Sequence, residues 1–520
     1  MDYLKHTIAL GTLLLVLSPL AAQNNPNRVR IQNSGIPRHL LPPEVIPQIP
    51  LTEEERITID RGISDLRSPD KEVRTGAVMI LGKYDHPSAR LPVIEALSDE
   101  SPRVRRAALV SVAEWSRGAP HQAIIPVLKL VGDEDLEIRR TASATIPTMM
   151  TIRQTYQIVR PSPDGPKPLP SDIIATLKAG FKDEDPVVRR NLVNHYYSLN
   201  INLPGETWIE LLNDPDRQVR LAALPLAARH APREVFFAKA KELAKSEDRI
   251  ERLQLARELN LRGVHPEAQE ILKLLQEDED QEVASEAILG QLKFASTNSL
   301  FKTAVKRLLE GKMTQDQGIR FFRVIQINPN DAIPYLPSLI QLDDSVLRRE
   351  AVAAYLDSGI ADGKPRKLDP LVEDPSESVR KEVINYLASG TGRTDDTLIE
   401  TMVFSPYLDV RAGLITVSNQ FQAEPAAELL MDLLLDENVQ IRARALQETV
   451  NRKLSPWSEV LSASLLDPDY QMQRAALGLI LKNPFPGDTE ALTNFLTEHP
   501  DSPLAPLIRA RLGKPKGSDT

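Results

Sequence analysis

Few residues of this chain have the types and spacing that catalysis or metal binding requires. Beyond residue 22, histidines lie at positions 39, 86, 121, 195, 230, 265 and 499. No two of them are three or four residues apart, the spacing that places two metal ligands on one helix face. Cysteine is absent, which excludes disulfides, cysteine-ligated zinc, iron–sulfur clusters and a thiol nucleophile. The sequence therefore predicts no catalytic residue, no metal and no cofactor.

Three acidic clusters could offer oxygen ligands to calcium: DEDLE (133–137), KDEDP (182–186) and QEDEDQE (276–282). They lack the loop spacing and the central glycine of an EF-hand. Each cluster lies in a turn just before a predicted helix. The favoured interpretation is that these carboxylates cap helices or face solvent in turns.

The overall charge argues against nucleic acid as a partner. Lysine and arginine total 63 and aspartate and glutamate total 72, so the net charge is −9. Binding to a phosphate backbone needs a basic surface. A glycine-rich phosphate loop and a Gly-x-Ser-x-Gly turn are also absent from the sequence.

An apolar residue, usually followed by arginine, recurs along most of the chain. Neighbouring copies are mostly 31 to 34 residues apart. Two intervals of 64 contain degenerate copies near Ile250 and Ile319, and one of 50 contains a proline-rich insertion near 151–170. With a last degenerate copy near Asp501, the pattern predicts roughly 13 or 14 units over residues 53–512. The apolar anchors are Val73, Val104, Ile138, Val188, Val219, Val283, Leu347, Val379, Val410, Ile441 and Met472.

Three positions of the unit predict how its second helix begins and packs. A serine or aspartate five residues before the anchor is expected to be the N-cap, which accepts hydrogen bonds from free helix N–H groups. A proline after it is expected at the first helical position. An alanine four residues after the anchor is expected on the buried face. The expected caps are Ser68, Asp99, Asp133, Asp183, Asp214, Asp278, Asp374, Ser405, Asp436 and Asp467; the prolines are 69, 215, 375, 406 and 468; the alanines are 77, 108, 142, 223, 287, 351, 445 and 476.

The recurring arginine follows the anchor directly and lies six residues beyond the acidic position. One hypothesis makes this row an anion-binding stripe. The favoured hypothesis is a ladder in which each arginine pairs with an acid of its own or the adjacent unit, because an acid accompanies nearly every arginine at a fixed offset. The arginines are residues 74, 105, 139, 189, 220, 348, 380, 411 and 442.

Each capped helix is preceded by another apolar segment with helical periodicity. Examples are LPVIEAL (91–97), IIPVLKLV (124–131), EILKLLQ (270–276), AAELLMDLLL (426–435) and SEVLSASLL (458–466). The unit is therefore helix, short turn, capped helix. No segment alternates apolar and polar residues as a strand does, so the predicted fold class is all-α, an α-solenoid.

This pattern resembles HEAT repeats, specifically the short type of about 30 residues found in phycobilisome lyase-like proteins. The aspartate and arginine six residues apart resemble the ladder residues of that class. The resemblance implies a superhelix of two-helix repeats that serves as a scaffold in unrelated systems. The iron-dependent hydroxylases built from HEAT-like repeats carry His-Glu pairs, and this sequence contains none. HEAT-like DNA glycosylases use a basic concave surface. The net negative charge of this chain argues against such a surface.

The ends of the chain predict export and irregular structure. Residues 1–22, MDYLKHTIALGTLLLVLSPLAA, have a lysine, an apolar stretch and small residues at a cleavage position, as a signal peptide does; an uncleaved anchor is the alternative. Residues 23–52 contain six prolines, so we expect an extended linker or arm, or, for 39–51, a cap on the first helices. Residues 513–520 are expected to be a disordered tail.

Aromatic side chains are candidate contacts for a partner if they are exposed. These are Trp115, Trp208 and Trp457, together with His195, Tyr196 and Tyr197. The alternative interpretation places them in the core of the solenoid.

The predicted function is that of a non-catalytic, exported scaffold. It would bind a partner protein or peptide along the concave surface, in the periplasm or outside the cell, with no nucleic acid and no stable membrane insertion after signal cleavage. Two alternatives stay open. One is a lyase- or isomerase-like enzyme with a pocket in the groove, and the other is a glycan-binding envelope protein.

Overall fold

The computed structural model describes most of the chain beyond residue 49. The described residues are 50–84, 86–115, 121–159, 168–294, 298–327, 329–362, 366–390 and 395–513. The predicted signal peptide at 1–22, almost all of the predicted arm at 23–52, and almost all of the predicted tail at 513–520 lie outside them. So do residues 160–167, which hold most of the prolines of the predicted insertion.

The described residues form helices and turns and contain no strand, which confirms the predicted all-α solenoid. The chain divides into two compact units, residues 1–236 and 237–520. Helix α13 (Arg233–Leu243) crosses this division. The two units are built on the same plan, and each is described by itself below.

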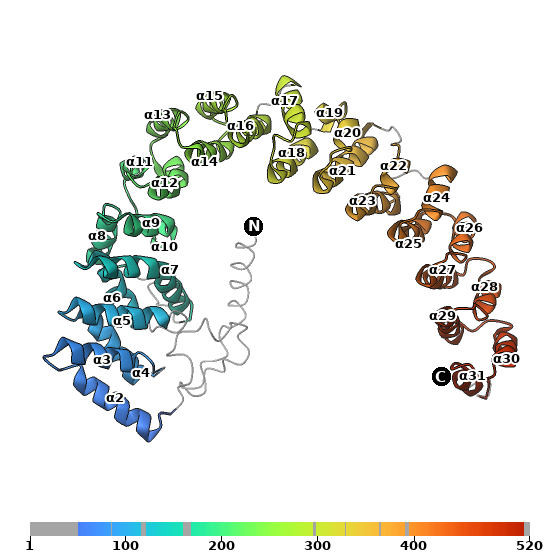
Figure 1. Cartoon of the computed structure of the whole chain (residues 1–520), viewed down its shortest axis with the longest axis horizontal. Coiled ribbons are helices and arrows are strands. Elements are labelled where there is room, and N and C mark those ends of the chain that lie inside the picture. Colours follow the sequence, from blue (N-terminus) through green and yellow to red (C-terminus); the bar gives the residue numbers. More distant parts are fainter. Residues whose placement is uncertain are drawn as a thin grey trace, which may run out of the picture. The chain divides into compact units, whose positions relative to one another are not determined.

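The N-terminal unit alternates first and second helices of successive repeats (Figure 1). Its first helices are α2 (Glu53–Asp65), α4 (Pro87–Glu95), α6 (Ile124–Lys129), α8 (Ser171–Gly180) and α11 (Gly205–Leu212). Its second helices are α3 (Lys71–Leu81), α5 (Pro102–Glu114), α7 (Leu136–Val159), α9 (Pro186–Asn194), which is followed by the short α10 (Tyr196–Leu199), and α12 (Arg217–His230).

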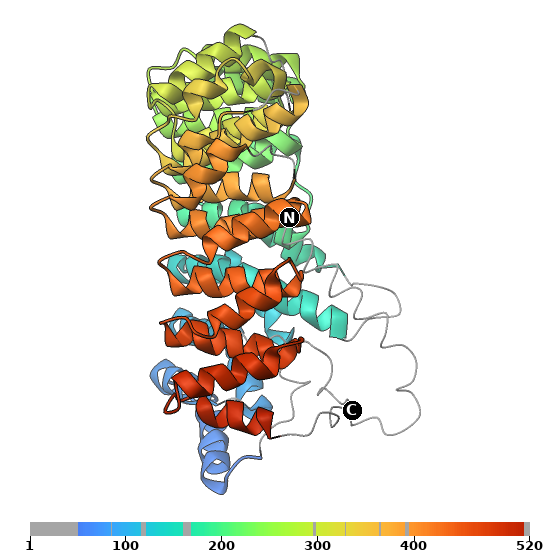
Figure 2. The same ribbon diagram turned by 90° about the vertical axis from the view of Figure 1, so that its right-hand side faces the viewer.

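The C-terminal unit continues the alternation, and Figure 2 shows its helices α24 to α31 stacked in successive layers. Its second helices are α14 (Arg249–Asn260), α16 (Gln281–Phe294), α18 (Gln315–Ile327), α21 (Ser345–Asp362), α23 (Glu377–Ala388), α25 (Leu408–Val417), α27 (Val439–Asn451), α29 (Tyr470–Lys482) and α31 (Ala505–Leu512). Its first helices are α15 (Pro266–Leu275), α17 (Asn298–Leu309), α19 (Pro329–Ala332), α20 (Leu336–Leu339), α22 (Asp369–Val372), α24 (Asp396–Val403), α26 (Ala423–Leu433), α28 (Trp457–Ser464) and α30 (Asp488–Glu498).

Second helices of neighbouring repeats pack directly on each other, as α3 does on α5 and α27 does on α29. The predicted alanine column lies in these contacts, because all eight alanines are buried. The anchors are buried as well, with Val73 as the exception at 40% exposure. Helix α3 belongs to the first described repeat, so no described second helix precedes it to cover Val73. Each repeat thus shelters the apolar face of the next, as a solenoid requires.

The predicted N-caps are wrong by two residues. Helix α5 begins at Pro102 and not after Asp99, because the Asp99 carboxylate accepts the N–H of Ser101 at 2.8 Å and holds a turn before the helix. A second polar residue then caps most of these helices, as Asp216 does by accepting the N–H groups of Gln218 and Val219. The other side-chain caps are Asp70, Asp135, Asp185, Asp248, Asp280, Asp344, Asn438 and Asp469.

The predicted places of the prolines are also wrong. Pro69, Pro215, Pro375, Pro406 and Pro468 lie inside the turn, since their helices begin two residues further on. Their fixed φ suits a turn as well as a first helical position. The predicted insertion near 151–170 is shorter than expected, because residues 151–159 continue α7 to Val159.

In the part of the chain that the structure describes, every helix is too short or too polar to cross a membrane. The first 49 residues lie outside this part.

Replacing Ala108 with leucine tests the packing of the second helices. Ala108 is fully buried in α5, so the larger side chain should overpack the stack and lower the free energy of unfolding by about 1–3 kcal/mol. Thermal unfolding followed by circular dichroism measures this. Ala175→Leu in α8 is the matched control, because Ala175 is exposed and the change should be within about 0.5 kcal/mol. Equal stability of the two variants would contradict the packing described here.

Candidate functional site

The recurring arginine is bound first to its own turn. Arg105 donates from Nη1 to the carbonyl oxygens of Asp99 and Glu100, both at 3.0 Å. Arg189 makes the same pair of bonds to Asp183 and Glu184, at 2.6 and 3.0 Å. These carbonyls precede the second helix and have no partner within it, so the arginine closes the turn that starts its own repeat.

The same arginine also pairs with the acid of the next repeat. Arg105 donates from Nε and Nη2 to the two carboxylate oxygens of Asp133 at 2.7 and 2.8 Å, and both side chains are about nine-tenths buried or more. This confirms the ladder hypothesis and shows that the partner belongs to the adjacent repeat. The other pairs of this kind are Arg74–Asp99, Arg139–Asp183, Arg189–Asp214, Arg252–Asp278, Arg348–Asp374, Arg411–Asp436 and Arg442–Asp467. Arg380 pairs instead with Asp409 at 2.8 Å, because Ser405 occupies the acidic position of the next repeat.

Ladder pairing keeps both partners charged. Hydrogen bonds to Asp133 raise the pKa of Arg105 above its ordinary value. For Asp99, burial alone would raise the pKa, but the hydrogen bonds from Arg74 and the Ser101 N–H outweigh it, and the pKa of Asp99 lies below its ordinary value. The arginines of these pairs are therefore neutralised by their own acids, which contradicts a free anion-binding stripe.

The ladder is interrupted around α16, where Ala284 occupies the arginine position and Leu342 occupies an acidic position two repeats later. There Arg320 of α18 reaches back and donates to both carboxylate oxygens of Glu286 at 2.6 Å. Glu286 is completely buried, and α16 is buried continuously from Val283 to Leu292. This pair joins α16 to α18 in place of the missing ladder pair, so we assign it a structural role.

The three acidic clusters are engaged in the ladder and in helix caps. Asp183 pairs with Arg139, and Asp185 caps α9 and pairs with Arg140 at 2.6 Å. Asp278 and Asp280 pair with Arg252 and Arg249. The interpretation as caps and turns is confirmed, with the cap at the second aspartate of each cluster. Among the described residues, no group of three or more histidines, aspartates and glutamates is arranged to hold a metal.

Most of the aromatic candidates belong to the core. Trp208 is fully buried against Phe181 and Tyr196, with ring centroids 6.0 and 4.6 Å away. Trp115 is buried and donates from Nε1 to the Gly82 carbonyl at 2.7 Å. Tyr197 is exposed, and the Arg229 guanidinium lies 5.7 Å from its ring centre. The tryptophans therefore do not form an exposed aromatic row.

An exposed apolar row, defined as Phe404, Leu435 and Leu466, was missed by sequence reasoning. Each residue directly precedes the ladder residue of its repeat, and the three are spaced by 31 residues. They are 78%, 84% and 41% exposed, and Leu435 and Phe404 are the two most exposed large apolar side chains of the described residues. Other repeats mostly have polar residues or glycine here: Arg67, Ser98, Gly132, Lys182, Asn213, Lys245, Glu277, Gln341 and Glu373. That contrast was the signal in the sequence.

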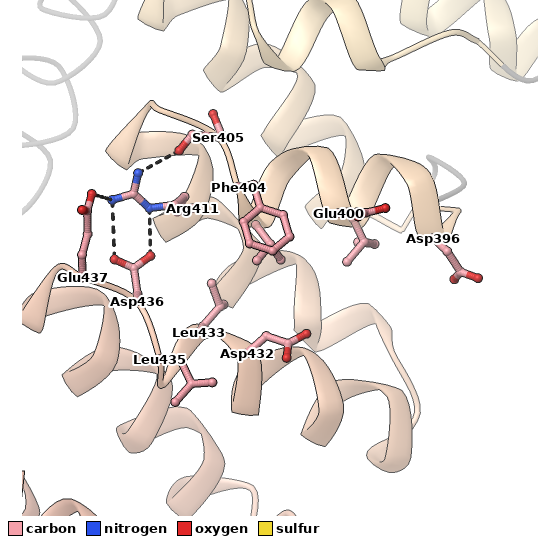
Figure 3. A pocket seen from close by; sticks show the side chains of 12 residues that line it. Asp396, Glu400, Phe404, Ser405, Arg411, Asp432, Leu433, Leu435, Asp436 and Glu437 are labelled. Atoms are coloured by element: carbon pink, nitrogen blue, oxygen red, sulfur yellow. Dashed lines mark hydrogen bonds and ion pairs between the residues drawn. The ribbon is translucent and has the colours of Figure 1, made fainter.

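The first two residues of the row line a groove of about 560 Å³ between α24 and α26, here called the acidic groove (Figure 3). In Figure 3 the Phe404 ring lies between the Arg411 ladder contacts at one end and Glu400 and Asp396 at the other. Leu433, Leu435 and Asp432 face it from α26 and the turn that follows.

The charge of the acidic groove is negative. Asp396, Glu400 and Asp432 line it, and none of them forms an ion pair within the described residues. Arg411 is the one cation in the lining, and it is already bound to Asp436 at 2.8 Å and to Glu437 at 3.2 Å. The groove therefore combines exposed apolar surface with uncompensated carboxylates.

Comparison with known families agrees with this geometry. A sequence model described as HEAT repeats matches residues 62–146, and one described as HEAT repeat associated with sister chromatid cohesion matches residues 169–190. The chain is a HEAT-repeat protein. The ladder and the buried alanine column extend the same repeat beyond the matched residues. A search of curated proteins found no match to this HEAT-repeat protein.

Solved structures of similar solenoids cover most of this HEAT-repeat protein at low identity. Importin β, crystallised in an ammonium sulfate condition, is 14% identical, with a TM-score of 0.41, over 85% of this chain and 69% of that one. Kap121p bound to Nup53p is 13% identical, with a TM-score of 0.45, over 89% and 57%. The complex of CpcE and CpcF of phycocyanin lyase from Nostoc is 19% identical, with a TM-score of 0.23, over 54% and 98%.

Proposed function

We propose that this HEAT-repeat protein is a non-catalytic scaffold that binds an extended segment of a partner protein. The apolar row carries the proposal. Exposed apolar side chains at one position of three consecutive repeats cost solubility, and Phe404 and Leu435 bury little of their surface in the core. Exposed apolar side chains that gather in one place mark interaction sites. The uncompensated carboxylates beside the row select a partner segment that also carries lysine or arginine.

The repeat sets the spacing that a partner segment must match. Adjacent helices pack about 8–10 Å apart, and an extended polyproline-type segment rises about 3.1 Å per residue. Apolar side chains three residues apart on such a segment would meet Phe404, Leu435 and Leu466 in turn. Basic residues between them would lie near Glu400 and Asp432.

We also propose that the protein acts outside the cytoplasm, on the strength of residues 1–22. Expression of the full chain in a bacterium should yield a soluble extracytoplasmic protein beginning at Gln23, because Ala21 and Ala22 suit signal peptidase. Intact-mass spectrometry of fractionated cells measures this. A full-length chain retained in the membrane fraction would show an uncleaved anchor, and a full-length chain in the cytoplasm would contradict export.

Selection from a random peptide library against the immobilised chain tests the scaffold proposal. We expect enriched peptides with apolar residues three apart and lysine or arginine between them. Substituting Phe404 and Leu435 with serine should lower the affinity of the chain for the enriched peptides at least tenfold, because the exposed apolar side chains that contact the peptide are lost. Fluorescence anisotropy measures this affinity.

The matched control replaces Leu261 and Val264 with serine. These apolar side chains are 71% and 70% exposed but lie outside the acidic groove, so peptide affinity should not change. Lack of any enriched sequence, or equal affinity of the enriched peptides for the Phe404 and Leu435 double variant, would contradict the proposal.

A further inference from the structure

A second groove, on the layer of second helices, has the opposite charge. It lies between α27 and α29 with a volume of about 720 Å³, and we call it the basic groove. Arg444, Arg474 and Lys482 line it together with Gln447, Gln471 and Tyr470, and no carboxylate belongs to its lining. This composition stands out in a chain whose net charge is −9.

The three cations of the basic groove have no acidic partner. Within the part of the chain that the structure describes, Arg444, Arg474 and Lys482 make no ion pair or side-chain hydrogen bond. Exposed arginines of another second helix, α14, do have acidic partners. Arg249 pairs with Asp280 and Glu282, and Arg257 pairs with Glu282. Three unpaired positive charges facing one groove therefore raise the local potential and attract an anionic ligand.

The floor of the basic groove is kept open by a glycine. Gly478 lies in the middle of α29, four residues after Arg474 and four before Lys482, so the three share one helix face. A Cβ placed on Gly478 would meet no atom within 4 Å. The preceding repeat has Gln447 at the equivalent position, six residues after its anchor. Glycine weakens a helix interior relative to alanine, and here it leaves the surface between two cations unoccupied.

We propose that the basic groove binds an acidic segment of a protein partner. Arg474 and Lys482 are eight residues apart on α29, which is about 12 Å along a helix. Carboxylates about four residues apart on an extended chain would reach both cations. The amides of Gln447 and Gln471 each offer a donor and an acceptor, as a peptide backbone requires.

The number of cations in the basic groove favours a protein segment over a nucleic acid as the ligand. Stable binding to a nucleic acid backbone typically neutralises about 6–10 phosphates, whereas this groove offers three cations. A short acidic peptide matches that number. The proposal does not depend on the acidic groove, which lies between the first helices α24 and α26 and has the opposite charge.

Fluorescence anisotropy with a fluorescein-labelled hexaglutamate peptide and the full chain tests the proposal. We expect saturable binding that weakens with rising salt. Arg474→Glu should lower the affinity for the peptide at least tenfold, because it removes one positive charge and adds a negative one. Gly478→Leu should lower this affinity at least fivefold, because the leucine side chain fills the groove. Circular dichroism should show that helix content is retained, because the position is open and leucine is a better helix former than glycine.

Two control variants are matched to these substitutions. Lys273→Glu makes the same charge change on the exposed face of α15. Gly76→Leu changes the other mid-helix glycine, in α3, whose Cβ would also meet nothing within 4 Å. Neither should alter peptide affinity, and the Phe404 and Leu435 double variant should bind hexaglutamate as the wild type does.

Three results would overturn the proposal. The first is absence of saturable hexaglutamate binding. The second is equal weakening by the groove variants and their controls, which would show a diffuse charge effect. The third is tighter binding of an oligothymidylate of equal charge that is lost with Arg474→Glu and Gly478→Leu, which would assign the groove to nucleic acid.

Discussion

The buried contact between an arginine and the aspartate of the next repeat is the interaction on which the rest of the structure depends. Moving a charge from water into the protein interior costs free energy, and this cost is offset only when the ion pair has excellent geometry and its hydrogen bonds are satisfied. Arg105 meets both conditions, since it donates to two carbonyls of its own turn and to both oxygens of Asp133. Each such contact fixes one turn and joins two repeats, so the register of the array is set locally.

Because each contact joins only neighbouring repeats, the residues that hold the fold together differ from the residues that are free to bind a partner. Ladder residues, anchors and alanines are committed to the contact between neighbours. The residue before the ladder position and the exposed face of the second helix carry no such constraint. The apolar row and the basic groove both lie at these unconstrained positions. A solenoid can therefore change its binding surface from repeat to repeat without altering its core.

Much of the fold could be predicted from the sequence because residues that pack in the same way recur at the same position of each repeat. Ala108 and Val104 recur in register with their counterparts and are fully buried. The caps were misplaced because Asp99 and Ser101 are both good capping residues, and only the partner across the repeat shows that Asp99 binds Arg74 instead.

The candidate sites were harder to predict, since they are departures from the repeat. Phe404 and Leu435 resemble ordinary core residues next to a helix as long as each repeat is considered by itself. Comparing one position across all repeats would have found them. The basic groove could not be found in this way, because the absence of an acid near Arg444 and Arg474 depends on which helices lie side by side.

Native-state hydrogen exchange in α5 and α7 of two variants, Arg105→Met and Arg103→Met, tests the central role of the ladder most directly. Both arginines lie on α5 and pair with an adjacent repeat, but the Arg103–Glu72 pair is 64% and 49% exposed. Losing Arg105 leaves Asp133 buried and unpaired, which should lower the free energy of opening by about 3–5 kcal/mol. Losing Arg103 should lower it by less than about 1 kcal/mol. Equal, small losses in the two variants would contradict the account.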